Sequence, residues 1–442
     1  MGLLDMVQEA GVIGAGGAGF PTHIKLKATA EYILLNGAEC EPLLRVDQQL
    51  MARHPEEVIR GLMIGKEISG AGKAIIGIKE SHPDVIQIMR NAIREMGLEG
   101  QAEVGELPDV YPAGDEQVLV YELTGRVVPE TAILIAVGCV VMNAETAWNV
   151  YRASQGEPVI EKFLTVNGAV PHPVTVKVPV GTPIRTVLKL AGIDDPEEYG
   201  IIDGGPMMGP LLADVNGYVT KKSKGYVVLP PDHNLIRKKS REMATAVHLD
   251  RSACEQCSMC TDLCPRHLLG HSTVPHKMVR ALMYGAEADE KVSAALTCCQ
   301  CNLCEYFSCP AGISPKMANV FYMGRLREKQ IRHTPKDSYT PSAMRPYRQV
   351  PSKRLIARLG IRGFNAAAPL DENPPITVDT VGIQVNSHVG APAVPCVSVG
   401  DHVAAGQIIA KIKEGALGAN VHASIEGVVE AIENNRIILR RN

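Results

Sequence analysis

Nine of the 12 cysteines lie between Cys254 and Cys309, and this concentration constrains the chain more than any other feature. The other three, Cys40, Cys139 and Cys396, stand alone. In a reducing compartment, cysteines spaced this closely indicate metal or redox chemistry and not a disulfide framework. The segment is therefore predicted to be a metal-binding domain.

Eight of these cysteines form two runs of four, each followed by a proline. In two-cluster ferredoxins, the last Cys of each run binds the other cluster. The first run has the C-x2-C-x2-C-x3-C-P spacing of a 4Fe-4S motif and the second has one extra residue before its last Cys. We predict two ligand sets: Cys254, Cys257, Cys260 and Cys309 for one cluster, and Cys298, Cys301, Cys304 and Cys264 for the other. Cys299 is left over, either as a free thiol beside a cluster or as part of a shifted ligand set.

Two zinc sites are the structural alternative for this segment. Zinc modules usually present C-x2-C pairs that are well separated, whereas the first run packs four cysteines into 11 residues. The stretches from His276 to Tyr284 and from Ala286 to Leu296 have helical patterns. We expect a helical domain with two adjacent clusters that moves single electrons.

A second motif is the glycine loop GAGGAGF at residues 14–20. A Rossmann loop would follow a strand, but Leu3 to Ala10 has the pattern of a short amphipathic helix. Pro21 favours a helix start after the loop, and free backbone N–H groups there would suit a phosphate. A plain turn is the alternative.

Four ordered stretches add to this signal: GAGGAGFPTHIKL from Gly14, NGAECEPLLRVDQQLM from Asn36, YPAGDEQVLVYELTGR from Tyr111 and VVMNAETA from Val140. Together with the cysteine runs they resemble the flavin-bearing NADH-dehydrogenase subunit of respiratory complex I, and more closely the RnfC family. The resemblance covers most of residues 1–330. It implies FMN, two 4Fe-4S clusters and NADH as electron donor.

The resemblance also implies which residues bind the nucleotides. The cofactor-binding positions are Gly14, Gly16, Gly17, Gly19, Lys25, Asn36, Glu39, Tyr111, Gly114, Asp115, Asn143 and Thr146. The NADH-facing candidates are Phe20, Glu41 and Glu116, and no catalytic residue is assigned. Acidic side chains near a flavin would repel a second phosphate and so favour NADH over NADPH. The alternatives are solvated carboxylates for the acids and core positions for Phe20 and Tyr111. The chain departs from the complex I pattern at Ala38, where an acid is usual, and at Asp115, which replaces Glu.

Composition limits the partners. The 45 Lys and Arg against 48 Asp and Glu give a formal charge of −3, so no global field attracts nucleic acid or anionic lipid. The longest apolar run, Thr131 to Met142, is far shorter than the ~20 residues of a membrane helix and is predicted to be a buried strand. We expect a cytoplasmic protein with no membrane span and no nucleic-acid partner.

Two further modules complete the expected architecture. Residues 163–212 alternate valines around a predicted helix at Ile184 to Ala191 and resemble the soluble-ligand-binding β-grasp insert of the same families. Residues 388–439 resemble a barrel-sandwich hybrid of the lipoyl type, although the turn that would carry the modified Lys reads KEGALGAN. Residues 325–362 carry 11 Lys or Arg against two acids, which indicates a linker or a docking segment.

We therefore expect a multidomain α/β and α+β chain. Its parts are a complex I flavin-subunit-like α/β domain at residues 1–157, a β-grasp module at 158–240, a helical two-cluster ferredoxin domain at 245–324, a basic proline-containing linker at 325–380 and an unmodified barrel-sandwich hybrid at 381–442.

The order of these parts narrows the function. In membrane-complex RnfC subunits the barrel-sandwich module comes before the flavin motifs, whereas here it comes last. This order resembles the cobalamin reductases of propanediol-utilisation microcompartments. The resemblance implies an NADH-dependent reductase that delivers single electrons to cobalamin inside a bacterial microcompartment, with an adenosyltransferase and a shell protein as partners. The alternative is an RnfC-like electron relay between NADH and a ferredoxin or another protein, without a substrate site of its own.

Overall fold

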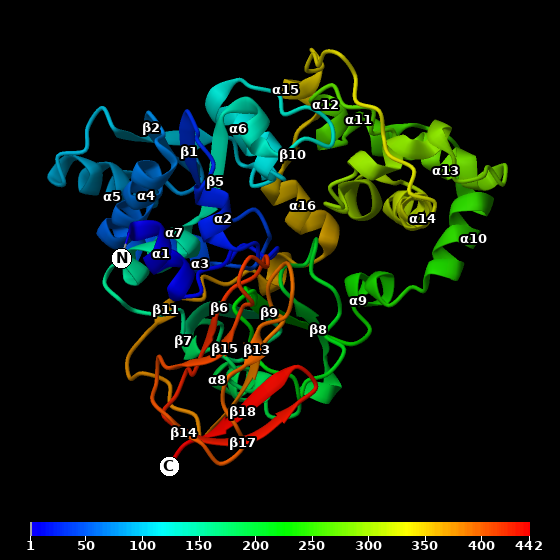
Figure 1. Cartoon of the computed structure of the whole chain (residues 1–442). Coiled ribbons are helices and arrows are strands. Elements are labelled where there is room, and N and C mark those ends of the chain that lie inside the picture. The colour runs from blue at the N-terminus through cyan, green and yellow to red at the C-terminus, as the bar shows by residue number, and fades with distance from the viewer. Residues whose placement is uncertain (1) are drawn as a thin grey trace.

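The computed structural model describes residues 2–442. The N-terminal part of the chain forms a parallel four-stranded sheet in the order β3-β2-β1-β5 (Figure 1). Helices cover both faces, and β1, β2 and β5 are buried on both sides, as is usual for parallel sheets, whereas the edge strand β3 is partly exposed. The strands are β1 (Tyr32–Asn36), β2 (Lys73–Lys79), β3 (Ala102–Leu107) and β5 (Cys139–Asn143). The helices are α1 (Leu3–Glu9), α2 (Thr22–Leu26), α3 (Val46–Arg53), α4 (Pro55–Ser69), α5 (Pro83–Glu95), α6 (Glu116–Thr124) and α7 (Ala144–Ser154).

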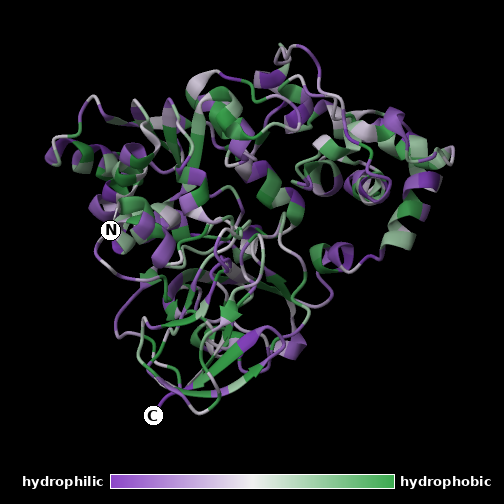
Figure 2. Ribbon diagram, viewed as in Figure 1, coloured by the Kyte–Doolittle hydropathy of each residue, from purple (hydrophilic) through white to green (hydrophobic). Residues whose placement is uncertain are grey.

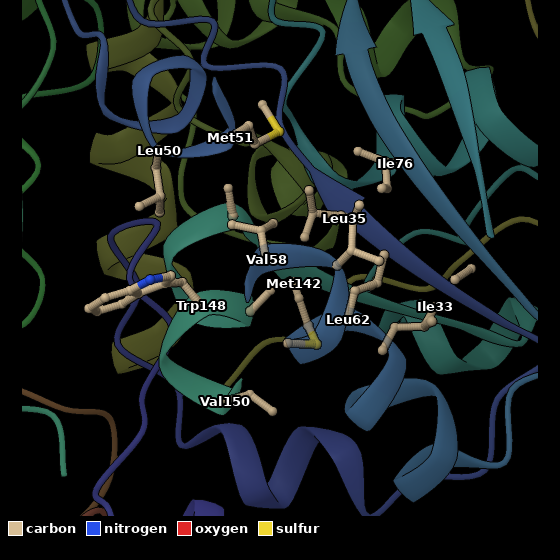
Figure 3. Packing of buried hydrophobic residues seen from close by; sticks show 14 of the residues in the cluster. Ile33, Leu35, Leu50, Met51, Val58, Leu62, Ile76, Met142, Trp148 and Val150 are labelled. Atoms are coloured by element: carbon tan, nitrogen blue, oxygen red, sulfur yellow. The ribbon is translucent and has the colours of Figure 1, made fainter. Parts of the chain in front are cut away.

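The two faces of β1 belong to two different cores. Ile33 and Leu35 face α4 and α7, while Leu34 points to the core beneath α6. Figure 3 shows Leu35 beside Leu62 and Met142 in the first core. The helices α4 and α7 touch at Gly61, where an added Cβ would lie 1.7 Å from the Ala147 carbonyl oxygen. A side chain at this position would force the two helices apart.

The strand predicted over the apolar run from Thr131 to Met142 is correct only for the last four residues of the run. The strand β5 begins at Cys139, and the preceding residues form the short 3-10 helix η1 (Leu134–Val137). Gly138, with φ of 71°, closes this turn and redirects the chain into the sheet. Ile133 is 72% exposed because it lies on the turn and not in the buried strand.

The next sheet has the order β11-β7-β6-β9-β8. Strands β6 and β9 are parallel, whereas β7 runs antiparallel to β6 and β8 runs antiparallel to β9. We call it the β-grasp sheet. The predicted helix from Ile184 to Ala191 is confirmed as α8 (Ile184–Leu190). The strands are β6 (Glu161–Gly168), β7 (Val174–Pro179), β8 (Gly200–Asp203), β9 (Gly225–Leu229) and β11 (Leu370–Asp371), with the 3-10 turn η2 (Pro196–Glu198).

The cysteine-rich segment is helical, as predicted. The helix expected from His276 to Tyr284 is α13 (Pro275–Met283), whereas the stretch from Ala286 to Leu296 forms a turn and the 3-10 helix η3 (Glu290–Thr297). The other helices are α9 (Asn234–Lys239), α10 (Met243–Ala253), α11 (Met259–Asp262), α12 (Pro265–Leu268), the π-helix η4 (Cys304–Ser308) and α14 (Pro315–Glu328). Figure 1 shows this group, in green and yellow, on the opposite side of α16 from the N-terminal sheet.

The basic segment that was expected to be a linker is packed against the rest of the chain. Leu355 and Leu359 are buried in a core that also contains Tyr111 and Tyr306. Arg345 pairs with Glu122 on α6. The segment forms α15 (Arg345–Arg348), β10 (Val350–Pro351), α16 (Ser352–Leu359) and η5 (Arg362–Phe364), and β10 pairs with β4 (Val110–Tyr111). It therefore connects the cysteine-bearing helices to the N-terminal sheet.

The C-terminal strands form two small sheets around one apolar core, as a barrel-sandwich hybrid requires. Figure 2 shows long hydrophobic stretches in the strands near the C-terminus. The first sheet has β12 (Thr380–Gln384), β18 (Arg436–Arg440), β17 (Gly427–Glu433) and β14 (His402–Val403), and the second has β13 (Val394–Pro395), β15 (Ile408–Lys411) and β16 (Val421–His422). None of the helices within residues 2–442 has the length and apolar character needed to cross a membrane.

Candidate flavin and iron-sulfur sites

Four cysteines line one cavity of about 230 Å³ at the edge of the helical segment. They are Cys254, Cys257, Cys260 and Cys309. Cys254 follows α10, Cys260 lies on α11, and Cys309 comes from the second run at the end of η4. Cys257 is exposed, while Cys260 and Cys309 are buried. The structure thus brings together the first of the two predicted sets.

The second predicted set lies deeper. Burial and the neighbouring thiols of Cys298 and Cys264 raise the pKa of Cys304 well above its ordinary value. The pKa of Cys301 is raised by its hydrogen bond with Cys299, by burial and by the nearby thiols of Cys264 and Cys304. Cys264, from the first run, therefore lies among the cysteines of the second run.

Both runs use the same backbone device to turn their cysteines inward. Gln256 and Ser258 in the first run have φ of 54° and 62°, and Gln300 and Asn302 at the matching places in the second have 55° and 62°. These left-handed residues curl each short loop around one centre. The two runs are therefore structural repeats of one another.

The donor sets fit iron-sulfur clusters. Burial raises the pKa of Cys260 to about 12, and a bound metal would offset this shift by favouring the thiolate. Within residues 2–442, no group of three or more His, Cys, Asp or Glu side chains is placed to hold a single metal ion. In a 4Fe-4S cluster each thiolate binds a different iron, so its four sulfurs stand further apart than the ligands of one ion.

Cys299 lies outside both sets, beside Arg266 and Cys301. The hydrogen bond with Cys301 lowers the pKa of Cys299, and Arg266 lowers it further. Arg266 also donates to Asp115 at 2.8 Å, which connects the helix after the first cysteine run to the start of α6. Cys299 is thus a candidate free thiol next to the second set.

Tyr111 makes a second connection at the same boundary. Its buried hydroxyl donates to the Cys301 carbonyl oxygen at 2.8 Å. The resemblance implies that Tyr111 and Asp115 lie at the flavin, and in the structure their polar atoms also contact the cysteine-bearing segment. In the first set, by contrast, Cys257 reaches the surface.

The glycine loop and two asparagines meet at the carboxyl ends of the parallel strands. Asn36 ends β1, and Asn143 ends β5 and caps α7 through the Glu145 amide. The Ala15 amide in the loop donates to Thr146 Oγ1 at 2.9 Å. Ligands of open α/β sheets bind outside the carboxyl ends of the strands. The predicted residues of the glycine loop, Asn143 and Thr146 are therefore brought to the place that a nucleotide would occupy.

The loop itself is open where a cofactor must approach. Gly16, Gly17 and Ala18 are exposed, and Gly17 has φ of 119° with no heavy atom within 4 Å of an added Cβ. Accessible backbone N–H groups without covering side chains suit a phosphate or a flavin edge. The residues present therefore fit FMN at this loop.

Asn36 and Gly114 lie together beside the loop. The side-chain amide of Asn36 donates to the Gly114 carbonyl at 2.9 Å, and its oxygen accepts from the Ala38 amide. An added Cβ on Gly114 would lie 3.1 Å from the Cys40 sulfur. The glycine therefore allows this close packing of the two predicted flavin positions.

Asp47 and Lys224, which the sequence analysis did not single out, lie beside Asn143 at the same end of the sheet. Asp47 accepts both contacts of the Asn143 side-chain amide at 3.0 Å and pairs with Lys224 from the β-grasp sheet. The Asp47 amide donates to Glu39 at 2.7 Å. Burial and the nearby Asp47 raise the pKa of Glu39 to about 7. Asp47 lies in the stretch from Asn36 to Met51, but nothing local in the sequence indicates Lys224 as its partner.

The NADH-facing candidates have different surroundings. Glu116 is exposed and lies 3.4 Å from Lys25, whose ammonium also donates to the Val141 carbonyl at 3.0 Å. Phe20 is half-buried at the end of the glycine loop. Glu41 accepts from the amides of Met207 and Met208, each at 2.8 Å, so both its oxygens are engaged by the β-grasp sheet. Glu41 thus has both carboxylate oxygens engaged, whereas Glu116 makes one ion pair with Lys25.

Comparison with known proteins identifies three domains in the chain. The model of the Nuo51 FMN-binding domain matches residues 7–152, that of the 4Fe-4S dicluster domain matches residues 253–314, and that of the RnfC barrel sandwich hybrid domain matches residues 372–441. The chain is 45% identical to the cobalamin reductases PduS of Citrobacter freundii and Salmonella typhimurium, over 99% of this chain and 96% of each relative. It belongs to the PduS cobalamin reductase family.

Other known proteins align with only part of this chain. One component of the Na⁺-translocating ferredoxin:NAD⁺ oxidoreductase complex of Acetobacterium woodii is 36% identical over 60% of this chain and 57% of its own length. A chain of the NAD⁺-reducing [NiFe]-hydrogenase aligns over 76% of this chain and 63% of its own, with 20% identity and a TM-score of 0.49. The predicted resemblance to the RnfC and PduS families is confirmed, as is the predicted set of FMN, 4Fe-4S and barrel-sandwich domains.

Proposed function

We propose that this chain is an NADH-dependent FMN and iron-sulfur reductase that delivers single electrons to cobalamin, from cob(III)alamin to cob(II)alamin and on to cob(I)alamin. Its role would be to recycle coenzyme B12 during propanediol degradation. The observation that carries the proposal is the 45% identity to PduS cobalamin reductases over nearly the full length of both chains.

The described residues supply the binding functions that this reaction needs. When bound, FMN accepts a hydride from NADH as an electron pair and releases the electrons singly to the clusters. Gly16, Gly17 and Lys25 would bind the flavin phosphate region, and the two cysteine sets would hold the clusters. Tyr111 and Asp115 keep the second set fixed against the N-terminal sheet.

The negative charge of Glu116 favours NADH over NADPH as the electron donor. Glu116 is exposed beside the loop, and its carboxylate would repel the extra phosphate of NADPH. We expect NADH to be used in preference to NADPH. The aromatic ring of Phe20 would contribute a surface for the nucleotide at the end of the loop.

The remaining partners follow from the family. We propose that an adenosyltransferase takes up the reduced cobalamin and that a shell protein places the enzyme inside a bacterial microcompartment. Purification of intact microcompartments from a host that carries the chain would test the location. Recovery of the chain only outside the particles would contradict it.

An anaerobic reaction tests the main proposal. The purified chain is analysed for flavin, iron and sulfide, then mixed with NADH in the presence and absence of cob(III)alamin while the corrin absorption is followed. Bleaching of the protein together with reduction of the corrin would support the reductase. A colourless zinc protein without flavin would contradict it.

The RnfC-like relatives give a second candidate, because those at 34 to 36% identity are subunits of oxidoreductase complexes. In that case the chain would pass electrons between NADH and a ferredoxin or another protein, without a substrate site of its own. The same experiment separates the two: NADH would bleach the protein, but the corrin would stay oxidised until a protein partner was added.

A further inference from the structure

A loop of the β-grasp sheet reaches into the nucleotide region of the N-terminal sheet. We call residues 220–224, with the sequence TKKSK, the lysine loop. Lys221 donates to the Gly11 carbonyl at 2.9 Å, just before the glycine loop, and Lys224 pairs with Asp47. The lysine loop is therefore anchored on both sides of the proposed flavin site.

Between these anchors, Lys222 runs directly over the glycine loop. An added Cβ on Gly19 would lie 2.7 Å from Lys222 Cδ and 3.0 Å from the Ser387 carbonyl oxygen. Gly19 also has φ of 69°, which disfavours other residues. The absence of a side chain at Gly19 thus makes room for the stem of Lys222.

The three lysines differ in how their charges are used. Lys221 donates to two carbonyl oxygens, those of Gly11 and Asn420, and Lys224 is paired with Asp47. Within residues 2–442, the ammonium group of Lys222 makes no hydrogen bond or ion pair. Only its backbone amide donates, to Thr220 Oγ1 at 3.2 Å. The half-buried Lys222 therefore brings a cation to the glycine loop without a fixed partner among the described residues.

We propose that Lys222 binds a phosphate group of the nucleotide held at the glycine loop, so that the β-grasp sheet supplies part of the nucleotide site. Gly16 and Gly17 are exposed in the same loop that Lys222 approaches at Gly19, and lysine is a common point-charge ligand for phosphate. The phosphate belongs either to FMN or to the dinucleotide that reduces it. This inference rests on the proposed function.

The nearest alternative partner for Lys222 is Asp203 at the end of β8. Burial raises the pKa of Asp203, and the nearby Lys222 opposes that shift. If Lys222 served only to balance Asp203, its replacement would change protein stability and leave phosphate binding unaltered. Nucleotide affinity therefore separates the two roles.

The test uses the full-length chain after removal of flavin by dialysis. Wild type, Lys222→Met, Lys222→Arg and the control Lys189→Met are titrated with FMN and with riboflavin, which lacks the phosphate, and flavin fluorescence is followed. Lys189 is exposed on α8 of the same sheet, so this variant makes an identical change of charge elsewhere. The titrations are repeated at high salt.

Lys222→Met is expected to bind FMN about tenfold or more weakly, because a charge-assisted hydrogen bond is lost, while riboflavin binding stays unchanged. Lys222→Arg should recover most of the affinity, and high salt should reduce the difference. A matching melting temperature of the flavin-free Lys222→Met chain would show that the fold is intact. Lys189→Met should behave as wild type.

A second arm covers the dinucleotide. If FMN binding is unaltered, the FMN-loaded variants are titrated with NAD⁺, and a selective loss in Lys222→Met would assign the phosphate to the dinucleotide. Unchanged affinity for both nucleotides would overturn the inference while leaving the reductase proposal intact. A wild-type chain that binds no FMN would instead contradict the proposed function itself.

Discussion

The buried pair of Lys162 and Glu145 lies between α7 and β6. The two side chains are 2% and 1% exposed, and Glu145 also accepts from the Phe163 amide at 3.1 Å. Burial lowers the pKa of Lys162, and Glu145 opposes that effect. The pair thus fixes the first helix after Asn143 to the β-grasp sheet, which keeps two walls of the nucleotide region in register.

We expect Glu145→Gln to be strongly destabilising, because it leaves the Lys162 ammonium buried without a counter-charge. Loss of one partner of a buried ion pair costs about 3–5 kcal/mol. The double variant Glu145→Gln with Lys162→Met should recover most of this loss. Melting temperatures of the three chains would measure the effect. Replacement of exposed Glu197 by Gln, which breaks its pair with Arg185, is the control and should change little.

At the scale of single elements, α6 depends on Asp115 in two ways. One carboxylate oxygen of Asp115 caps the helix by accepting from the Gln117 and Val118 amides at 3.1 and 3.2 Å. The other accepts from Arg266 at 2.8 Å. The cap therefore sets the start of the helix and also connects it to the cysteine-bearing segment.

Variants of Asp115 separate these two functions. Asp115→Asn keeps a capping oxygen but removes the charge opposite Arg266, whereas Asp115→Ala removes both. Loss of a cap costs about 1 kcal/mol, and a partly buried unpaired Arg adds to it. We expect the melting temperature to fall in the order wild type, Asn, Ala. The control Asp289→Ala removes only the cap of η3. An equal effect of the two Ala variants would contradict a role for the Arg266 contact.

At the scale of the whole molecule, the last cysteine of each run lies beside cysteines of the other run. If Cys264 serves the second set and Cys309 the first, Cys264→Ser should leave the same electron paramagnetic resonance signal as Cys298→Ser. Likewise, Cys309→Ser should match Cys257→Ser, and each variant should lose about half of its iron. Cys299→Ser and exposed Cys396→Ser should keep both clusters. A match between Cys264→Ser and Cys257→Ser would show that the runs do not cross.

The folding stability of the barrel-sandwich part also depends on pH, through His422 on β16. Burial and nearby Lys221 lower the pKa of His422 to about 3, although a backbone hydrogen bond at Glu9 opposes the shift. Because the unfolded chain takes up this proton near pH 6.5, stability is lost as the pH falls from about 6.5 towards 3. Above pH 6.5 this group has no effect.

His422→Leu should therefore reduce the acid sensitivity of folding. The variant takes up one proton fewer on unfolding. Within that range, the free energy of unfolding should therefore fall by about 1.4 kcal/mol less for each pH unit. Melting temperatures between pH 7 and pH 5 would show a smaller fall in the variant than in wild type. Replacement of the exposed His402 by Leu is the control. An unchanged slope in His422→Leu would contradict the buried neutral state.

Local sequence was sufficient to predict several helices, the cysteine loops and the domain types of this protein. The helices α1, α8 and α13 follow from periodicity, because each is stabilised by an apolar face that recurs within a few residues. The spacing of the cysteines fixes two tight loops, since left-handed residues between them leave few other conformations. The family resemblance supplied the domain types and cofactors, which the comparisons confirm.

Tertiary structure alone decided how these parts meet. Lys224 reaches Asp47 across 177 residues, and Arg266 reaches Asp115 across 151, so no local pattern could pair them. The Met207 and Met208 amides that donate to Glu41 also lie far along the chain from it. Sequence therefore determined the cysteine motifs, the local helices and the cofactor chemistry, whereas the partners of the charged side chains depended on the packing of distant segments, because burial requires each charge to find a counter-charge or a hydrogen bond.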